Sequence, residues 1–427
     1  MNRISVITLT ILMVSWQIVG LCPIPADQQP LIASLLRSMV RSINNQSSPN
    51  PSILIGLRLA QNHSLAKEKQ LLKALKDDAV NRVQKGLKFT SGEVALYVMA
   101  ISACCENPAK VLQLKRKNLV QLLSQKVNDE LDSVEIASTP LTNFYQIGLG
   151  VLALCQQGAV IPYPLVYRLL SNPAFRDTID DSQVSIDTIA VLAMALTCIK
   201  EQFTWDQKQT TDTTMKIIIK QILNQKKSDG IIGNIYSTGL AVQALTVTST
   251  FYNTSDWNYT QTIQKVLSEI PNGTFSNPMA ASQVIPSLVD RTYFDVTKLQ
   301  CSQDTDNLDM TEPPTVPATS ETLIRVQFTV TNAVANNFTD SITISLHKGS
   351  VLLSVMEEAA KEQPEKFSFK IENSSWGPFV TSIQGVGQST KDRTYWQFLS
   401  DTTPLEQGVG DYVVRDGENI TAKFTTY

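Results

Sequence analysis

The sequence predicts a large helical domain closed into an α/α toroid, followed by a small α+β domain. The chain has 427 residues, which is too long for one ordinary hydrophobic core. Along its first part, apolar segments rich in small residues recur at intervals of roughly 45 residues, a spacing typical of repeated helical hairpins. Its last part alternates apolar and polar residues instead, which is the pattern of half-buried strands.

The first element is a signal peptide over residues 1–20. Arg3 precedes an apolar run from Ile4 to Val19, as in secretory leaders. A membrane anchor is the alternative, but no later segment reaches the roughly 20 apolar residues that a membrane span requires. Secretion agrees with the N-x-S/T sequons, which indicate a glycoprotein. The sequons begin at Asn45, Asn62, Asn253, Asn258, Asn272, Asn337, Asn373 and Asn419.

Residues 21–301 form the expected helical domain. Leu72, Leu75, Ala79 and Val83 recur at helical spacing on a charged segment, so this helix buries one stripe. Other helices are apolar nearly all round, and each pairs with an amphipathic one. We expect these buried helices at residues 94–105, 148–155, 190–198, 239–245 and 280–288. Because a row of hairpins has two unpaired ends, we expect it to close into a toroid, with an open solenoid as the alternative.

Residues 302–322 are expected to form an extended linker, because their Pro, Thr and acidic residues offer little to bury. Residues 323–427 form the small α+β domain, for which a ubiquitin-like β-grasp is the first choice. Its helix is expected at Val351–Glu362 and ends before Pro364. Its strands are expected at residues 324–330, 342–346, 367–371, 379–383 and 420–424.

The cysteines fit a secreted protein. Six are present, and an even number in a secreted chain favours disulfides. Cys155 and Cys198 end equivalent buried helices of successive repeats. Because neighbouring parallel helices can bring their ends within bonding distance, we expect these two cysteines to be bonded.

Composition excludes several functions. The net charge is −3, without the basic excess of a nucleic-acid-binding protein. The two histidines, His63 and His347, are far apart in sequence, which argues against a histidine metal site and against a Ser-His-Asp triad. We expect His63 at the surface and His347 in a turn.

The acidic residues do not form the pairs that a toroid-type glycosidase or terpene cyclase uses. The run Asp177–Asp181 has the wrong spacing for a metal-diphosphate motif and is expected to be an interhelical loop. Glu93 and Asp187 each stand alone among apolar neighbours, whereas glycoside hydrolysis needs two facing carboxylates. We expect Glu93 to cap a helix, and Asp187 either to cap one or to contact a ligand. Such an enzyme, and a structural or protein-binding glycoprotein, are the alternative functions.

Binding is the function that remains, and two groups of residues suit it. Polar side chains at the ends of the buried helices, where we expect them to be exposed, can hydrogen-bond amides and hydroxyls. They are Tyr145, Gln146, Asp187, Asn234, Gln243 and Gln283. The second group is aromatic and comprises Trp376, Phe379, Tyr395, Trp396 and Phe398. A place in the core is the alternative for these aromatics, although Gly377 and Pro378 put Trp376 in a turn.

Seven stretches of the chain resemble the cobalamin-transport family of haptocorrin, gastric intrinsic factor and transcobalamin. They are NPSILIGLRLA (50–60), PLTNFYQIGLGVLALC (140–155), SIDTIAVLAMALTC (185–198), GIIGNIYSTGLAVQAL (230–245), FSNPMAASQVIPSL (275–288), SSWGPFVTSIQG (374–385) and RTYWQFLSDTTPLEQGVGDYVVRDGENI (393–420). The resemblance implies a monomeric, non-catalytic carrier that encloses cobalamin between an α6/α6 barrel and a small α/β domain, with a cell-surface uptake receptor as partner. The sequons and YVVRDGENI resemble haptocorrin, whereas NPSILIGLRLA and IYSTGLA resemble intrinsic factor.

The resemblance also implies which residues contact the corrinoid. On the helical side they are Tyr145, Gln146, Asp187, Asn234 and Gln283, with Asn234 standing where some relatives have Asp. On the small domain they are Ser375, Trp376, Gly377, Pro378, Phe379, Tyr395, Trp396, Gln397, Phe398 and Leu399. Transcobalamin-like relatives offer a histidine to the cobalt beside the SIDT motif. This chain has none there, so we expect no protein ligand to the metal.

By the same resemblance, family disulfides fall at Cys155–Cys198 and Cys105–Cys301. The third family bridge starts at Cys22, but Tyr259 stands where its partner cysteine belongs. Cys22 and Cys104 are therefore left over. A bond between these two is favoured over free thiols and over a link between two chains.

Overall fold

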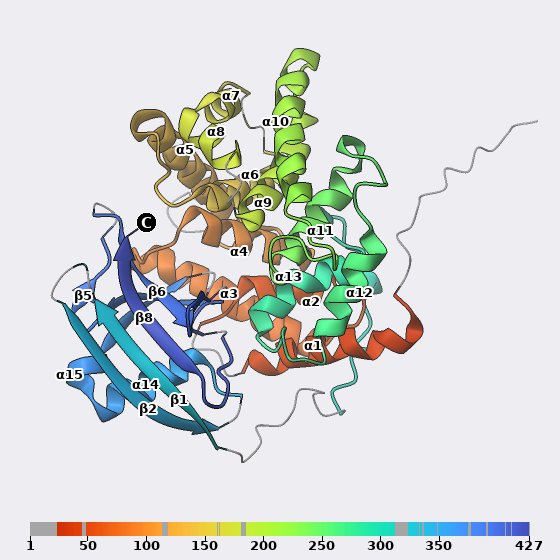
Figure 1. Ribbon diagram of the computed structural model, residues 1–427. Helices are drawn as coiled ribbons and strands as arrows, with labels where there is room; N and C mark the ends of the chain where they lie inside the picture. Colours follow the sequence, from red (N-terminus) through yellow and green to blue (C-terminus); the bar gives the residue numbers. More distant parts are fainter. Residues whose placement is uncertain are drawn as a thin grey trace, which may run out of the picture.

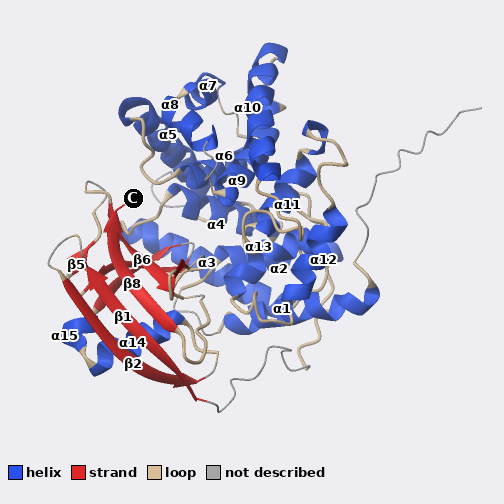
Figure 2. Ribbon diagram, in the orientation of Figure 1, coloured by secondary structure: helices blue, strands red, loops and turns tan. Residues whose placement is uncertain are grey.

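The structure is a computed structural model that describes residues 24–44, 48–112, 118–159, 161, 163–180, 185–311, 323–332, 334, 337–347, 349–374, 377–389, 392–405, 407–410 and 412–426. Outside these residues lie the expected signal peptide, Cys22, Asn45, Asp181, Ser375 and Trp376. A helical part and a smaller part with β-sheets lie side by side (Figure 1, Figure 2).

The helical part contains two kinds of helix. Helices that are apolar nearly all round are α2 (Pro51–Leu59), α4 (Ser91–Ala103), α6 (Phe144–Gln156), α9 (Ile186–Lys200), α11 (Thr238–Val247) and α13 (Pro278–Leu288). Helices with one buried face are α1 (Gln29–Ser42), α3 (Leu65–Lys85), α5 (Leu119–Ala137), α7 (Tyr163–Ser171), α8 (Pro173–Asp180), α10 (Trp205–Asn224) and α12 (Tyr259–Glu269). Short 3₁₀ turns are η1 (Ala26–Gln28), η2 (Pro108–Lys110), η3 (Ser249–Phe251), η4 (Tyr293–Asp295) and η5 (Cys301–Gln303).

The apolar helices contact one another in a continuous circuit. In chain order, α2 packs on α4, α4 on α6, α6 on α9, α9 on α11 and α11 on α13, and α13 then packs back on α2. The amphipathic helices α3, α5, α10 and α12 each contact members of this circuit. Because an outer helix returns the chain between successive inner helices, the inner helices run parallel and share one end for their N-termini.

Polar caps fix where the inner helices begin. The Asn50 and Asn143 side chains accept backbone N–H groups at the starts of α2 and α6. Thr90 and Glu93 form a reciprocal capping box at the start of α4, which confirms the capping role expected for Glu93. These caps fix where each inner helix begins, and so fix the position along the helix axis of the polar side chains in its first turn.

Two expectations about the outer helices are wrong. Residues 173–180 form α8 and not the loop expected around Asp177, because a polar segment can still fold as a helix when one of its faces is buried, as Phe175 and Ile179 are here. On α3, Leu75 and Ala79 are buried as expected, but Val83 is 38% exposed, since it lies in the last turn of the helix.

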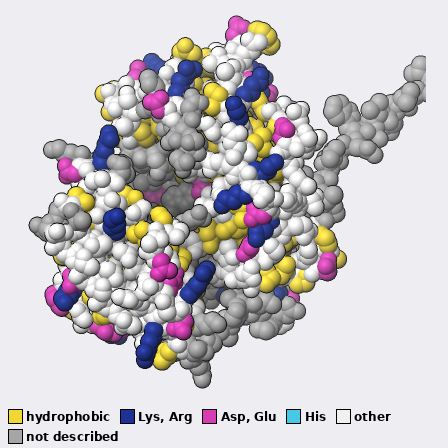
Figure 3. Space-filling model, in the orientation of Figure 1, with side chains coloured by type: hydrophobic (Ala, Val, Ile, Leu, Met, Phe, Trp, Pro, Cys, Tyr) yellow, Lys and Arg dark blue, Asp and Glu magenta, His cyan; other side chains and the backbone are white. Residues whose placement is uncertain are grey.

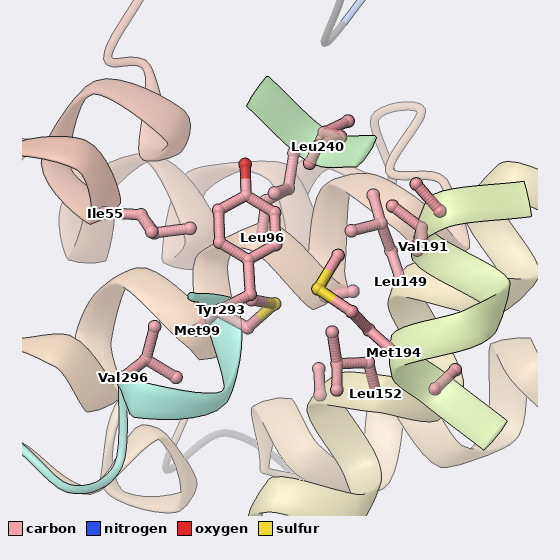
Figure 4. Packing of buried hydrophobic residues seen from close by; sticks show 14 of the residues in the cluster. Ile55, Leu96, Met99, Leu149, Leu152, Val191, Met194, Leu240, Tyr293 and Val296 are labelled. Atoms are coloured by element: carbon pink, nitrogen blue, oxygen red, sulfur yellow. The ribbon is translucent and has the colours of Figure 1, made fainter. Parts of the chain in front are cut away.

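Side chains fill the interior of the circuit. Figure 4 shows Tyr293 of η4 surrounded by apolar residues of the inner helices, among them Leu96, Leu149 and Met194. The backbone of Tyr293 is held from two sides, because its N–H donates to Gln243 Oε1 at 3.0 Å and its carbonyl accepts Gln156 Nε2. Gln243 is therefore fully buried and not exposed as expected. It binds the backbone at the centre of the helical part.

The smaller part consists of two sheets and two helices. One sheet has the order β2-β1-β8-β6-β7, with β1 antiparallel to β2 and parallel to β8. Its strands are β1 (Leu323–Asn332), β2 (Phe338–His347), β6 (Thr394–Ser400), β7 (Thr403–Pro404) and β8 (Asn419–Thr426). The other sheet joins β3 (Phe369–Ser374), β4 (Gly377–Ile383) and β5 (Val386–Gly387). Helix α14 (Leu352–Glu362) packs on β1 and β2.

One local expectation differs here. Phe367 ends a short helix, α15 (Pro364–Phe367), and does not begin a strand. Pro364 stops α14 and is then tolerated in the first turn of α15, where a missing N–H costs nothing. The Phe367 ring is buried in the core of the small domain.

The first half of the expected linker is packed against the helical part. Leu308 is buried and its N–H donates to the His63 carbonyl at 2.9 Å. Arg58, 5% exposed, forms ion pairs with both Asp304 and Glu68. His63 lies between these two carboxylates and is 5% exposed, so its expected place at the surface is wrong. Residues 302–311 are thus anchored, whereas residues 312–322 lie outside the described residues.

Two disulfides are present among the described cysteines. Cys155–Cys198 joins α6 to α9, and Cys105–Cys301 joins the end of α4 to η5; both confirm the expected pairs. Cys104 is free, whereas Cys22, its favoured partner, lies outside the described residues. Burial raises the pKa of the Cys104 thiol to about 12, which leaves it unreactive. Among the described helices, none is long and apolar enough to cross a membrane.

Candidate ligand-binding site

A cleft of about 700 Å³ separates the helical part from the small domain. The helical part contributes Ile231, Ile235, Tyr236, Glu269 and Thr274 to its walls, and the small domain contributes residues 400–405, Gln407 and Tyr412. Figure 3 shows the molecule hollowed between the two parts on the face drawn. The cleft therefore lies between the two domains, but none of the residues expected to contact the ligand is among the described residues that line it.

Asp187 occupies the N-terminal turn of α9, and its Ser185 neighbour caps that helix. The Asp187 Oδ1 atom is buried and has no hydrogen-bond partner among the described residues. Burial raises the pKa of Asp187 to about 6, and a hydrogen bond from Ser237 opposes this rise. An unpaired buried carboxylate oxygen costs free energy unless a donor reaches it. Asp187 Oδ1 is thus an acceptor without a donor among the described residues.

Two phenols lie beside this carboxyl group. Tyr145, on the first turn of α6, and Tyr293 are both buried. Burial raises the pKa of each phenol above its ordinary value, and the nearby Asp187 charge adds to the effect. Both hydroxyls therefore stay neutral at any physiological pH. Tyr145 and Asp187 are brought together by α6 and α9, but Tyr145 is buried and not exposed as expected.

The remaining helical-side residues have separate partners. Gln146 Oε1 accepts the Gly92 N–H at 3.2 Å and so ties α6 to α4. Asn234 Oδ1 accepts the N–H groups of Tyr236 and Ser237, both at 2.9 Å. Its Nδ2 group has no hydrogen-bond partner among the described residues, so this position presents a donor. Gln283 is half-buried on α13.

Strand β6 divides its expected contact residues between two faces. Trp396 is 5% exposed, its Nε1 donates to the Val386 carbonyl at 3.0 Å, and its ring packs on Phe424 with centroids 5.0 Å apart. Phe398 packs on the same core. Tyr395, Gln397 and Leu399 alternate with them and are half-buried on the opposite face. The alternative, a place in the core, therefore holds for Trp396.

The other expected segment of the small domain begins strand β4. Phe379 is 50% exposed. Pro378 packs closely on Gly410, where an added Cβ would come within 2.7 Å of the proline ring. Gly377 pairs with Ser374 at the hairpin end of β3 and β4. Ser375 and Trp376 lie outside the described residues.

The residues that line the cleft were not singled out from the sequence. Tyr236 follows Asn234 by two positions, and its phenolic oxygen accepts a hydrogen bond from Gln407 Nε2 of the small domain. Glu269 faces the cleft with its carboxylate bound by Lys265, Asn272 and Thr274; the Lys265 hydrogen bond is the main reason that its pKa is lowered. These residues lie in loops and helix ends, where no periodic pattern marks a functional side chain.

Comparison with known families defines the class of protein. Residues 4–320 match the family described as eukaryotic cobalamin-binding protein, and residues 349–426 match a domain of unknown function. The first match spans well over half of the chain. The chain therefore belongs to the eukaryotic cobalamin-binding protein family.

Individual relatives agree with this assignment. Human transcobalamin-1 is 35% identical over 424 residues, which cover 96% of this chain and 95% of that protein. The cobalamin binding intrinsic factor of the rat is 36% identical over 414 residues, covering 95% and 94% of the two chains. A solved structure of haptocorrin in complex with Cbi matches with a TM-score of 0.77 and 33% identity, and the match covers 95% of this chain and 100% of that chain.

Proposed function

We propose that the protein is a secreted, non-catalytic carrier that encloses cobalamin between its two domains. The observation that carries the proposal is the interdomain cleft of about 700 Å³ in a chain that is similar over 95% of its length to a haptocorrin solved with Cbi. A corrin is a large, mostly apolar disc with an amide fringe. It needs apolar walls and a few polar groups that pair with amides.

The helical side offers such polar groups. Asp187 Oδ1 is an acceptor without a protein donor, and Asn234 Nδ2 is a donor without a protein acceptor among the described residues. An amide group carries both complements, an N–H and a carbonyl. We infer that Asp187, Asn234 and Gln283 bind the amide fringe from the helical side. Tyr395, Gln397, Leu399 and the β4 residues Gly377–Phe379 bind from the small domain.

The proposed architecture is an α6/α6 toroid and a β-grasp domain. The circuit of contacts from α2 through α13 and back to α2 supports closure of the inner ring. The sheet order β2-β1-β8-β6-β7 supports the β-grasp fold. Its strands β1 and β8, the first and last of the domain along the chain, are parallel neighbours, and α14 packs on β1 and β2. We place the domains at residues 21–301 and 323–427, with residues 302–311 attached to the first domain.

The surroundings of the acidic residues favour a carrier over a toroid enzyme. Among the described residues, Asp187 faces Ser237 and two tyrosines and not a second carboxylate. Glu93 is engaged in its capping box and in an ion pair with Arg82 at 3.1 Å. Secretion and glycosylation are supported by the exposure of the sequon residues Asn253, Asn258, Asn272, Asn337 and Asn419.

Equilibrium dialysis with cyanocobalamin tests this function. We expect about one molecule bound per chain at micromolar concentration. Loss of most of the affinity on changing Asp187 to Ala, but not on changing the exposed Asp77, would place the ligand at the predicted carboxyl group. No binding by the unaltered protein at micromolar ligand would contradict the proposal.

A further inference from the structure

Among the described residues, one side-chain hydrogen bond joins the two walls of the cleft. Gln407 Nε2 of the small domain donates to the phenolic oxygen of Tyr236 in the helical part. Both residues line the cleft. We propose that Tyr236 and Gln407 are positioning residues that hold the two domains together and set the rate of ligand release. This inference rests on the proposed function.

The helical side of this bond is held rigidly. Tyr236 lies one residue before the N-cap position of α11, and its backbone N–H donates to the Asn234 carboxamide oxygen. The Tyr236 ring packs edge-on against Phe275, with centroids 6.1 Å apart and planes at 78°. Phe275 is 1% exposed. The backbone and ring of Tyr236 are therefore held in place. The turn that holds them also presents the Asn234 Nδ2 donor.

The small-domain side is braced as well. Gln407 lies in a loop whose Leu405 N–H donates to the Phe398 carbonyl of β6 at 2.9 Å. Beyond Gln407, the Val409 carbonyl accepts the Leu353 N–H at 2.7 Å, and Val409 itself is buried. The loop is thus bound both to β6 and to the start of α14.

The bond therefore links two segments that carry expected ligand contacts. The Asn234 turn stands on one side, and β6 with Tyr395 and Gln397 stands on the other. A corrinoid held between the domains leaves only when they separate, and separation breaks this bond. Its loss should raise the release rate, because separation of the domains then no longer has to break this bond.

The test uses the full-length protein loaded with cyanocobalamin, with release followed after addition of excess competing corrinoid. We expect Tyr236→Phe and Gln407→Ala each to speed release about fivefold, the factor expected for loss of one hydrogen bond of ordinary strength. The double variant should release no faster than either single variant. Tyr252→Phe is the matched control, because the Tyr252 hydroxyl donates to the Leu245 carbonyl within the helical part.

A second readout needs no ligand. Small-angle X-ray scattering of the ligand-free protein should show a larger radius of gyration for Tyr236→Phe than for Tyr252→Phe. Release rates equal to that of the unaltered protein in all three cleft variants would overturn the inference. If the unaltered protein does not bind cyanocobalamin, the proposed function fails instead. In that case unchanged scattering of the variants overturns the inference on its own.

Discussion

Asp187 combines a structural cost with an expected binding role. Burial raises the pKa of its carboxyl group to about 6, compared with about 3.9 in an unfolded chain. The folded state thus binds the proton more tightly than the unfolded state does. The stability from this difference is complete below about pH 4 and is lost as the pH rises through 6. At neutral pH the buried charge is therefore a cost that the ligand can offset.

The first prediction concerns the stability of the ligand-free protein. Asp187→Asn keeps the shape and removes the charge, so it should raise the free energy of unfolding at pH 7.5 by about 3 kcal/mol. Near pH 4 the difference should vanish. Urea unfolding at the two pH values measures it, with Asp77→Asn as control because that side chain is 66% exposed. An equal gain at both pH values would contradict the burial argument.

The second prediction concerns cobalamin affinity and pH. An amide N–H that donates to Asp187 Oδ1 favours the ionised form, so binding should lower the pKa of Asp187. Affinity of the unaltered protein should then fall as the pH drops below about 6, and Asp187→Asn should remove most of this dependence. Equilibrium dialysis between pH 4.5 and pH 8 measures both. Parallel pH profiles for the two proteins would exclude an ionised Asp187 from the site.

Trp396 gives the third prediction. Because its ring is in the small-domain core, Trp396→Ala should lower the stability of that domain by about 3–5 kcal/mol. Phe379→Ala, at a side chain that is 50% exposed, should change stability by less than about 0.5 kcal/mol and act on ligand release instead. Hydrogen exchange, measured at increasing denaturant concentration, gives the stability of each domain separately. A Trp396→Ala protein that is as stable as the unaltered protein but releases the ligand faster would contradict the core position and indicate that Trp396 contacts the ligand.

For single residues, the sequence predicted which residue types form the site better than it predicted where their side chains point. Tyr145 and Asp187 lie close together, because capped parallel helices place their first turns side by side. Gln243 points inward, because an all-round apolar helix gives no polar face to distinguish inside from outside. Tyr236 and Gln407 were missed because their contact joins two loops far apart in the chain.

Among the elements, the inner helices were the most predictable. Their apolar residues and their caps agree, so local and global preferences coincide. Helix α8 was missed because its polar residues resemble a loop, and only packing against α7 and α10 shows its buried face. The anchored segment 302–311 was missed for a similar reason. Its acidic residues suggest solvent, but Arg58 of α2 and the loop before α3 bind them.

The fourth prediction tests this anchor. Asp304→Ala removes one of the two carboxylates bound to buried Arg58, which should destabilise the helical part by about 3 kcal/mol. It should also expose residues 304–311 to proteases in the folded protein. Asp77→Ala, which breaks only the exposed pair with Lys73, should do neither. Limited proteolysis with mass spectrometry measures whether residues 304–311 become accessible, and an unchanged cleavage pattern in Asp304→Ala would contradict the anchoring role of Asp304.

For the whole molecule, two domains joined through one tether explain why neither half needs to bind tightly alone. The domain that completes the site is present at a high effective concentration, which rises as the tether shortens. Residues 302–311 are anchored to the helical part, so they do not act as part of that tether. The disulfide Cys105–Cys301 fixes its starting point against α4. The two-domain order was readable from the change of hydrophobic period, whereas the length of the tether depended on tertiary contacts.

The most direct test of the central claim is whether the ligand joins the two domains. A protease site inserted within residues 312–322 allows the folded chain to be cut after purification, and size-exclusion chromatography then separates or retains the fragments. With one equivalent of cyanocobalamin, we predict that both fragments and the ligand elute together. Without ligand, the fragments should separate at micromolar concentration. Elution of all the cobalamin with one fragment alone, or separation of the fragments at saturating ligand, would contradict enclosure between the domains.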